Sequence, residues 1–425
     1  GHSVPVYLLD TDLPENSPWD RSITDSLYGG DVHYRLCQEM VLGFGGFALL
    51  HAVGHDHIYR YHLNEGHAAL LVLALIEAAI GAEPRNGEVP PEVIEQVREH
   101  CVFTTHTPVP AGHDQFPADL AHRVLGTRRC ELAQACQHQG ALNMTLLALR
   151  GSRFVNGVAM RHGEVSHSLY PGYPIHSITN GVHAVAWAAP AFQSLYDRHL
   201  PDWRYDQLSL RYAISIPGTD IWAAHREAKL ALVDEVNRET NAGFDRDVLT
   251  IGFARRATAY KRGMLVFHDV ERLQRLGKQR GPIQFVFAGK AHPQDEEGKE
   301  MIRRIHAMRG QLSVAYLANY DMTLARLLCA GVDVWLNTPL PPMEASGTSG
   351  MKAAMNGVPS LSVLDGWWVE GHIEGVTGWS IGEKVEASGS LPEELQACHA
   401  AALYDKLEQQ VLPCFYNDRE RFIEI

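Results

Sequence analysis

The sequence predicts an α/β protein of two domains, 1–190 and 191–425, with a cleft between them. Three observations support this prediction. The chain has 425 residues, which at about 150 residues per domain is enough for two or three domains. Hydrophobic residues make up 45% and charged residues 20%, a composition that allows a large core and excludes a disordered chain. In the second half, short β-rich runs alternate with helical stretches, as in a parallel, doubly wound sheet.

The elements of the second half follow one another regularly. The expected strands are 248–253, 283–288, 312–317, 332–336 and 360–364. The expected helices are 219–238, 264–276, 295–308, 322–329 and 351–356. Because parallel sheets bind ligands at the carboxyl ends of their strands, we expect the functional residues of this half directly after those strands.

The first half is more helical. The expected helices are 32–53, 66–80, 91–100 and a long helical stretch up to 149, and the expected strands are 57–61, 102–105 and 175–179. The run Val4–Leu9 already resembles a strand, so we expect the chain to begin inside a domain. The N-terminal domain is therefore expected to be incomplete.

Charge and cysteine content narrow the functional classes. The net charge of −13 disfavours binding to nucleic acid or to an anionic membrane, because both need a basic face. The longest apolar run, Ala68–Ile76, is far too short to cross a bilayer, and the N-terminal Gly-His-Ser is not typical of a signal peptide. Seven cysteines without a CxxC pair predict reduced thiols and a cytoplasmic protein.

A basic segment, GFARRATAYKRG at 252–263, follows the first strand of the second half. It places Arg255, Arg256, Lys261 and Arg262 within eight positions. An anion among them would relieve their repulsion, and a strand end that leads into a helix is where anions bind. A solvated basic turn is the alternative, and the residues alone leave the two interpretations about even.

A second segment, EASGTSGMKAAMNG at 344–357, contains a glycine-rich turn and a lysine. Residues Gly347–Gly350 can form a nest of backbone N–H groups suited to a phosphate, although GxxxxGK[ST] does not match. We expect Lys352 in the first turn of a helix, where the helix dipole disfavours its charge. An imine to an aldehyde cofactor would remove that charge. The alternative is a surface lysine after a flexible loop.

Two polar motifs of the first half also follow expected strands. His106 lies in TTHT and Asn180 in TNGVH, so each is expected at a strand end that faces the cleft. A loop cap is the alternative for both. Five histidines lie between residues 51 and 67, but they lack HExxH or facial-triad spacing, and we expect no metal site.

Five segments in order, TNGVH, RRATAYKR, FAGKAHP, ANYDMTLA and EASGTSGMKAAMNG, resemble those of the α-glucan phosphorylases. The segment LDGWWVEG at 364–371 is similar to that of the shorter bacterial and archaeal type. The resemblance extends over nearly the whole chain, and EASGTSGMK is its most specific part. It implies two Rossmann-like domains in the GT-B arrangement and a pyridoxal 5′-phosphate cofactor bound as an imine.

The implied reaction transfers a terminal α-1,4-linked glucose from a glucan such as glycogen or maltodextrin to phosphate, and gives α-glucose 1-phosphate with retention. By the same resemblance, Lys352 is the imine lysine, and the other cofactor contacts are Arg255, Thr348, Tyr320 and Trp187. Arg256 and Lys261 would hold the substrate phosphate. The glucosyl unit would be bound by His106, Asn180, Glu344, Ser346 and Gly347.

The resemblance also implies how the reaction proceeds. The cofactor phosphate, with a second pKa near 6, would pass a proton through the substrate phosphate to the departing oxygen. The cations would offset the repulsion between the two phosphates. A paired-carboxylate hydrolase fits poorly, since it needs two acids that flank the bond and Glu344 has no acidic partner in its motif.

The chain departs from the family at both ends. Family members have a longer N-terminal region with a glycine-rich loop, and GFGG at 43–46 does not fit that role because it follows a helical stretch. The end, RFIEI, is expected to precede the final helices of the family. Two alternatives remain, a nucleotide-sugar glucosyltransferase of the same architecture and a glucan- or cofactor-binding module without turnover. The preferred glucan and an oligomer of identical chains are left open.

Overall fold

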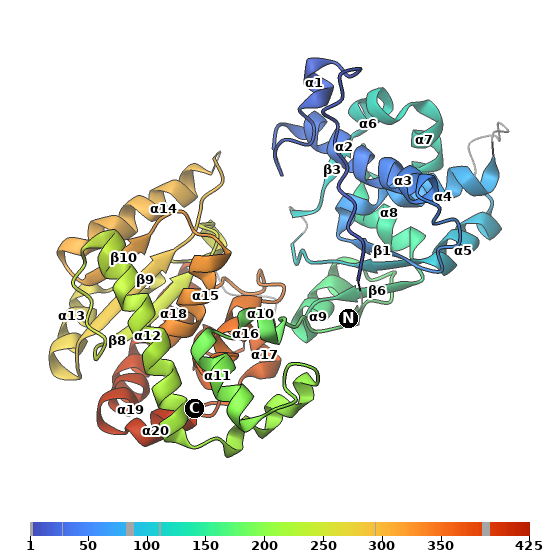
Figure 1. The fold of residues 1–425 in the computed structure, drawn as a ribbon. Coiled ribbons are helices and arrows are strands. Elements are labelled where there is room, and N and C mark those ends of the chain that lie inside the picture. The colour runs from blue at the N-terminus through green and yellow to red at the C-terminus, as the bar shows by residue number, and fades with distance from the viewer. Residues whose placement is uncertain (1–2, 28, 82–88, 110–111, 294, 385–391) are drawn as a thin grey trace. The chain divides into compact units, whose positions relative to one another are not determined.

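The computed structural model describes residues 3–27, 29–81, 89–109, 112–293, 295–384 and 392–425. The chain forms two compact units (Figure 1). The smaller extends to Val158 and includes His162–Ile178, and the larger comprises Ala159–Arg161 and Thr179–Ile425. The α/β class is confirmed, because each unit combines helices with a parallel sheet. In the described part of the chain, no helix is both long and apolar enough to span a membrane.

The larger unit is built on a six-stranded sheet whose paired strands are all parallel. Its strands are β8 (Leu249–Ala254), β9 (Ile283–Ala288), β10 (Ser313–Leu317), β11 (Val334–Asn337), β12 (Ser360–Val363) and β13 (Gly378–Ile381). The strand order is β10-β9-β8-β11-β12-β13. From β8 the chain adds β9 and β10 on one side, and then adds β11, β12 and β13 on the other side of β8. Doubly wound sheets bind ligands where the order reverses, here at the carboxyl ends of β8 and β11.

Helices cover both faces of this sheet, because successive side chains of a strand point to opposite faces. In β9, Phe285 and Phe287 belong to one core cluster, whereas Val286 and Ala288 belong to another. The first cluster includes side chains of α13 (Val270–Gln279) and α18 (Pro392–Lys406), and the second those of α12 (Gly218–Thr240) and α15 (Met322–Gly331). Further helices of this unit are α10 (Ala184–Trp187), α11 (Pro190–His199), α14 (Glu296–Ala307), α16 (Thr348–Ala354), α17 (Trp368–Gly371), α19 (Leu412–Asn417) and α20 (Arg419–Glu424).

The smaller unit holds two sheets. The parallel sheet has the order β1-β2-β6-β7, and the small antiparallel sheet has the order β3-β5-β4. Their strands are β1 (Tyr61–Asn64), β2 (Cys101–Thr104), β3 (Gln115–Pro117), β4 (Gln137–His138), β5 (Ala141–Asn143), β6 (Phe154–Gly157) and β7 (His176–Ser177). The surrounding helices include α2 (Val32–Met40), α3 (Gly46–Ala52), α4 (Leu70–Ile80), α5 (Pro91–His100), α6 (Ala118–Leu125), α7 (Thr127–Leu132), α8 (Met144–Gly151) and α9 (Met160–Leu169).

Several expected elements differ in the structure. The long helical stretch expected up to 149 is interrupted by β3, β4 and β5, and the helix expected at 264–276 begins only at Val270. The run Val4–Leu9 forms no strand, and its Val4, Val6 and Leu8 side chains are at least 79% exposed. The strand expected at 57–61 begins only at Tyr61, where residues pair with β2. The expected helix 32–53 contains a π-helical segment, Val41–Gly45, which places the first glycines of GFGG inside a helix.

Candidate functional site

Buried cations meet a carboxylate at the point where the strand order of the larger unit reverses. Arg255 directly follows β8, and Lys261 ends a short 3-10 turn. Glu344 lies in the segment after β11, the neighbour of β8. Lys261 Nζ lies 2.8 and 2.7 Å from the two Glu344 oxygens, and Arg255 Nη2 lies 2.7 Å from Oε2. Three of the predicted site residues, Arg255, Lys261 and Glu344, are therefore in direct contact in the structure.

This cluster is buried and has excess positive charge. The side chains of Arg255, Lys261 and Glu344 are only 7–9% exposed. Burial, reinforced by the Arg255 charge, lowers the pKa of Lys261 to about 8. Burial alone would raise the pKa of Glu344, but the charges of Arg255 and Lys261 outweigh burial and hold it below its usual value. Two cations thus share one carboxylate, and an additional anion would find unsatisfied charge here.

An unpaired donor strengthens this interpretation. Arg255 Nη1 is buried and has no hydrogen-bond partner among the described residues, and the same holds for the nearby Ser346 Oγ. A buried polar group without a partner costs about 1–3 kcal/mol. Arg256 is exposed, and its charge contributes to the lowered pKa of Lys261, which places it close to the same cluster.

Arg262 does not belong to this cluster, so the prediction that all four cations surround an anion is wrong. Its guanidinium donates to the carbonyl oxygens of Thr338 and Pro339, at 2.9 and 2.7 Å. A further contact of 2.8 Å joins it to His399 Nδ1. Burial, followed by the Arg262 charge, lowers the pKa of His399 to about 4, so this imidazole is a neutral acceptor. Arg262 braces the loop that leads to Glu344.

Lys352 lies against an aromatic ring. Its Nζ is 3.7 Å from the centroid of the Trp187 ring, and burial lowers the pKa of the amine. Tyr320 follows β10 and packs partly buried against the cluster that contains Cys329. The helix α16 begins at Thr348, so Lys352 is its fifth residue. The predicted first-turn position is wrong, and the dipole argument that rested on it does not apply.

The segment Glu344–Gly347 is clamped by the turn after β12. Asp365 Oδ2 accepts a hydrogen bond from the backbone N–H of Glu344 at 2.8 Å, and the Trp367 N–H donates to the Ser346 carbonyl at 2.8 Å. A Cβ on Gly366 would lie 2.4 Å from that carbonyl oxygen, so only glycine allows this approach. The clamp fixes the backbone that presents the Glu344 carboxylate to Lys261.

His106 and Asn180 are the two predicted site residues that come from the polar motifs of the first half. His106 belongs to the smaller unit, where its Nε2 lies 2.6 Å from Asn64 Oδ1 and its N–H donates to Glu65 at 2.7 Å. Burial lowers the pKa of His106. Asn180 belongs to the larger unit and follows Thr179, whose hydroxyl donates to Glu370 at 2.6 Å. Both residues stay predictions as site residues.

The histidine-rich stretch contributes one residue to a charged network. Ligand atoms of Glu39, His67 and Asp114 lie within 4.8 Å of one another. Arg35 Nη2 donates into the same group, 3.1 Å from Glu39 and 3.2 Å from Asp114. The arginine already supplies a positive charge there, so we interpret the cluster as an ion-pair network.

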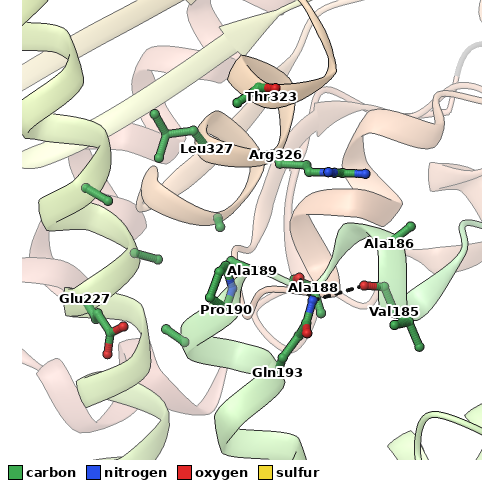
Figure 2. Close-up of a pocket in the computed structure, with 14 residues that line it drawn as sticks. Val185, Ala186, Ala188, Ala189, Pro190, Gln193, Glu227, Thr323, Arg326 and Leu327 are labelled. Atoms are coloured by element: carbon green, nitrogen blue, oxygen red, sulfur yellow. Dashed lines mark hydrogen bonds between the residues drawn. The ribbon is translucent and has the colours of Figure 1, made fainter.

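A largely apolar pocket of about 470 Å³ lies elsewhere in the larger unit (Figure 2). Its walls come from α10, α11, α12 and α15, and half of its lining residues are alanines. Arg326, one of its few charged residues, holds its guanidinium 5.9 Å from the Trp187 ring centroid. No predicted site residue lines this pocket, so its walls do not provide the anion site.

Comparison with known proteins shows the family of this chain. A family model described as carbohydrate phosphorylase matches residues 127–405. The chain belongs to the carbohydrate phosphorylase family. It is 40% identical to a maltodextrin phosphorylase of Thermococcus litoralis, over 99% of this chain and 54% of that protein. It is 37% identical to a glycogen phosphorylase of Aquifex aeolicus, over 99% and 65%. The chain thus spans between half and two thirds of the length of these relatives.

Sequence reasoning missed residues that form hydrogen bonds with the candidate site. Asp365 and Asn356 make buried hydrogen bonds to the backbone of predicted site residues. Both stand within segments already singled out, LDGWWVEG and EASGTSGMKAAMNG. Both are polar residues close after a strand or a short helix, and this position could have indicated that they support the site. Glu65, which accepts the N–H of His106, directly follows β1, but the strand was expected at 57–61, so the signal was not recognised.

Proposed function

We propose that this chain catalyses the phosphorolysis of α-1,4-glucans, in which a terminal glucose passes from the glucan to inorganic phosphate to give α-glucose 1-phosphate. The names of the two relatives above, a maltodextrin and a glycogen phosphorylase, support this reaction. The observation that carries it is the buried Arg255–Lys261 pair, which has more positive charge than Glu344 neutralises. A phosphate substrate supplies the missing negative charge.

The cofactor in this proposal is pyridoxal 5′-phosphate. Lys352 would attach it, Trp187 and Tyr320 would line its ring, and Arg255 and Thr348 would hold its phosphate. The residues fit such a group, because the Lys352 amine faces an aromatic ring and Arg255 Nη1 is a buried donor without a partner in the part of the chain that the structure describes. When bound, the cofactor supplies a phosphate whose second pKa near 6 allows proton exchange at neutral pH.

The protein's own residues would bind and orient the reactants. Lys261 and Arg256 would hold the substrate phosphate, and their charges would offset the repulsion between two phosphates, which amounts to several kcal/mol in a dry site. Glucose hydroxyls would be bound by His106, Asn180, Glu344, Ser346 and Gly347. The clamp from Asp365 keeps Glu344 in place for this task, and fixed partners of this kind favour the transition state.

The wider architecture and setting belong to the same proposal. We propose two Rossmann-like domains in the GT-B arrangement, divided near residue 190. The doubly wound strand order of the larger unit supports this architecture. All seven cysteines are free thiols, which supports the cytoplasm as its location.

The test is glucose 1-phosphate formation from maltodextrin and phosphate after loading with pyridoxal 5′-phosphate. We expect turnover by the wild type and a loss of about 100-fold or more in K261A, the usual effect of removing one transition-state contact. Lys299, which pairs with Glu296 on the surface, provides the control variant K299A with unchanged turnover. Turnover only with a nucleotide sugar, or none with any donor, would refute the phosphorylase proposal.

A further inference from the structure

Trp187 sits on an element that cannot hold itself in place. Helix α10 has only four residues, far fewer than an isolated helix needs for stability. The chain leaves the helix at Ala188 and enters α11 only at Pro190. The position of the Trp187 indole must therefore be set by contacts from other elements.

Asn356 provides such a contact and ties it to Lys352. Its side chain is fully buried. Asn356 Nδ2 donates to the carbonyl of Trp187 and to that of Lys352, each at 2.9 Å. Oδ1 accepts the N–H of Ala189 at 2.7 Å. One amide thus satisfies three backbone groups from two segments that lie more than 160 residues apart.

Other anchors of the same region do not join these two backbones. Gln193 Nε2 donates to the Val185 and Ala188 carbonyls (Figure 2), which ties α10 to α11. Tyr196 donates its hydroxyl to the Met355 carbonyl at 2.8 Å, which ties α11 to the end of α16. Among the residues that the structure describes, Asn356 is the one whose side chain bonds to the backbones of both Trp187 and Lys352.

We propose that Asn356 is a positioning residue that fixes the Trp187 indole against the Lys352 amine. This inference rests on the proposed function, in which the lysine carries the cofactor and the indole lines it. The geometry prepares the pair before any ligand arrives, and preorganisation of this kind strengthens binding by lowering its entropic cost.

The test measures the apparent dissociation constant of pyridoxal 5′-phosphate by absorbance titration, with borohydride reduction and peptide mapping to place the adduct. For N356A we expect affinity about tenfold weaker, as the loss of buried hydrogen bonds of this kind implies. N356D keeps the acceptor for Ala189 but loses both donors, and should weaken binding similarly. Y196F, the control, breaks a bond at the same helix end and should retain wild-type affinity.

Two further variants separate positioning from folding. N356S keeps one donor and should lie between N356A and the wild type, which also covers the case that N356A does not fold. In a W187L background the effect of N356A should largely vanish, because contacts that act through one residue are not additive. Circular dichroism identifies the temperature at which every variant stays folded.

The possible failures are distinguishable. A wild type without a pyridoxyl adduct on Lys352 refutes the proposed function. A labelled wild type with equal affinity in the Asn356 variants, or an undiminished effect in W187L, overturns only the role of Asn356. If Y196F weakened cofactor binding as much as N356A, the role of Asn356 would also be refuted. The loss of affinity would then follow from any disruption at this helix end.

Discussion

The Asp365 carboxylate holds the backbone of Glu344 through a buried hydrogen bond of 2.8 Å. Its second oxygen accepts the N–H of Gly366 at 3.0 Å. Both bonds disappear in D365A, so Glu344 should lose its fixed place beside Lys261. We expect the KM for phosphate to rise by about tenfold and the free energy of unfolding to fall by about 1–3 kcal/mol. Steady-state kinetics and urea unfolding measure the two effects, and unchanged kinetics would show that the clamp has no functional role.

The lowered pKa of Lys261 predicts that phosphate binding weakens at high pH. This pKa is about 8, so the lysine's positive charge and phosphate affinity should fall as pH rises through 8 in the free protein. The unfolded chain keeps its lysine proton up to about 10.5. The Lys261 contribution to the free energy of unfolding should therefore increase as pH rises from 8 to 10.5. Phosphate binding should weaken over the same range. Calorimetric titration with phosphate from pH 6 to 10 measures the affinity. In K261R the side chain stays charged, so phosphate affinity should no longer fall above pH 8. A fall that persists in K261R would show that another group causes it.

Replacing Glu344 tests whether the buried cations of the site bind an anion. In E344Q the buried Arg255 and Lys261 lose their carboxylate, and breaking a buried pair costs about 3–5 kcal/mol. We expect E344Q to unfold at a lower temperature and to be stabilised by phosphate more than the wild type. Thermal unfolding with and without phosphate measures both. E296Q, which breaks an exposed pair with Lys299, should change little. Equal phosphate effects in E344Q and wild type would contradict an anion site here.

Arg262 should act through the loop that it braces. R262M removes the donors to the Thr338 and Pro339 carbonyls and should cost about 2–3 kcal/mol of stability, with a loss of activity. H399A removes only one partner of the guanidinium and should cost less. Denaturant unfolding compares the two variants. A larger effect in H399A would mean that the contact with α18 matters more than the loop.

The ion-pair network of the smaller unit predicts a second pH effect. Hydrogen bonds from His67 to Asp114 and Glu39 raise the pKa of this histidine to about 9. Since the unfolded value is near 6.5, the stability that His67 contributes is complete below pH 6.5 and is lost as pH rises through 9. Urea unfolding of wild type and H67Q across this range should give a difference that shrinks with pH. A constant difference would refute the charged state of His67.

Much of the larger unit could be predicted from sequence, because its strands are buried on both faces and read as short apolar runs. Residues 283–288 form β9 as expected. The edge strand β13 escaped prediction, since Gly378–Ile381 is a short run that begins with glycine. In the smaller unit, Val4–Leu9 has the pattern of a strand but no partner among the described residues. Pattern indicates what a segment can form, and pairing decides whether it does.

The candidate site was predictable in its residue types but not in its contacts. Spacing places Arg255, Lys261 and Arg262 together, yet the left-handed turn at Arg262 directs that side chain to Thr338 and Pro339. Similarly, the start of α16 depends on the left-handed Gly347, which moved Lys352 away from the first turn. Single backbone angles of this kind are set by tertiary packing and leave little trace in sequence.

The central claim is that Arg255 binds the phosphate of a group attached to Lys352, and that Lys261 beside it binds the substrate phosphate. A crystal structure of the protein grown with pyridoxal 5′-phosphate and phosphate tests it most directly. We predict density continuous with Lys352 Nζ, a ring against Trp187, and phosphate oxygens within hydrogen-bond distance of Arg255 Nη1. A bare lysine, with both cations still paired only to Glu344, would contradict the account.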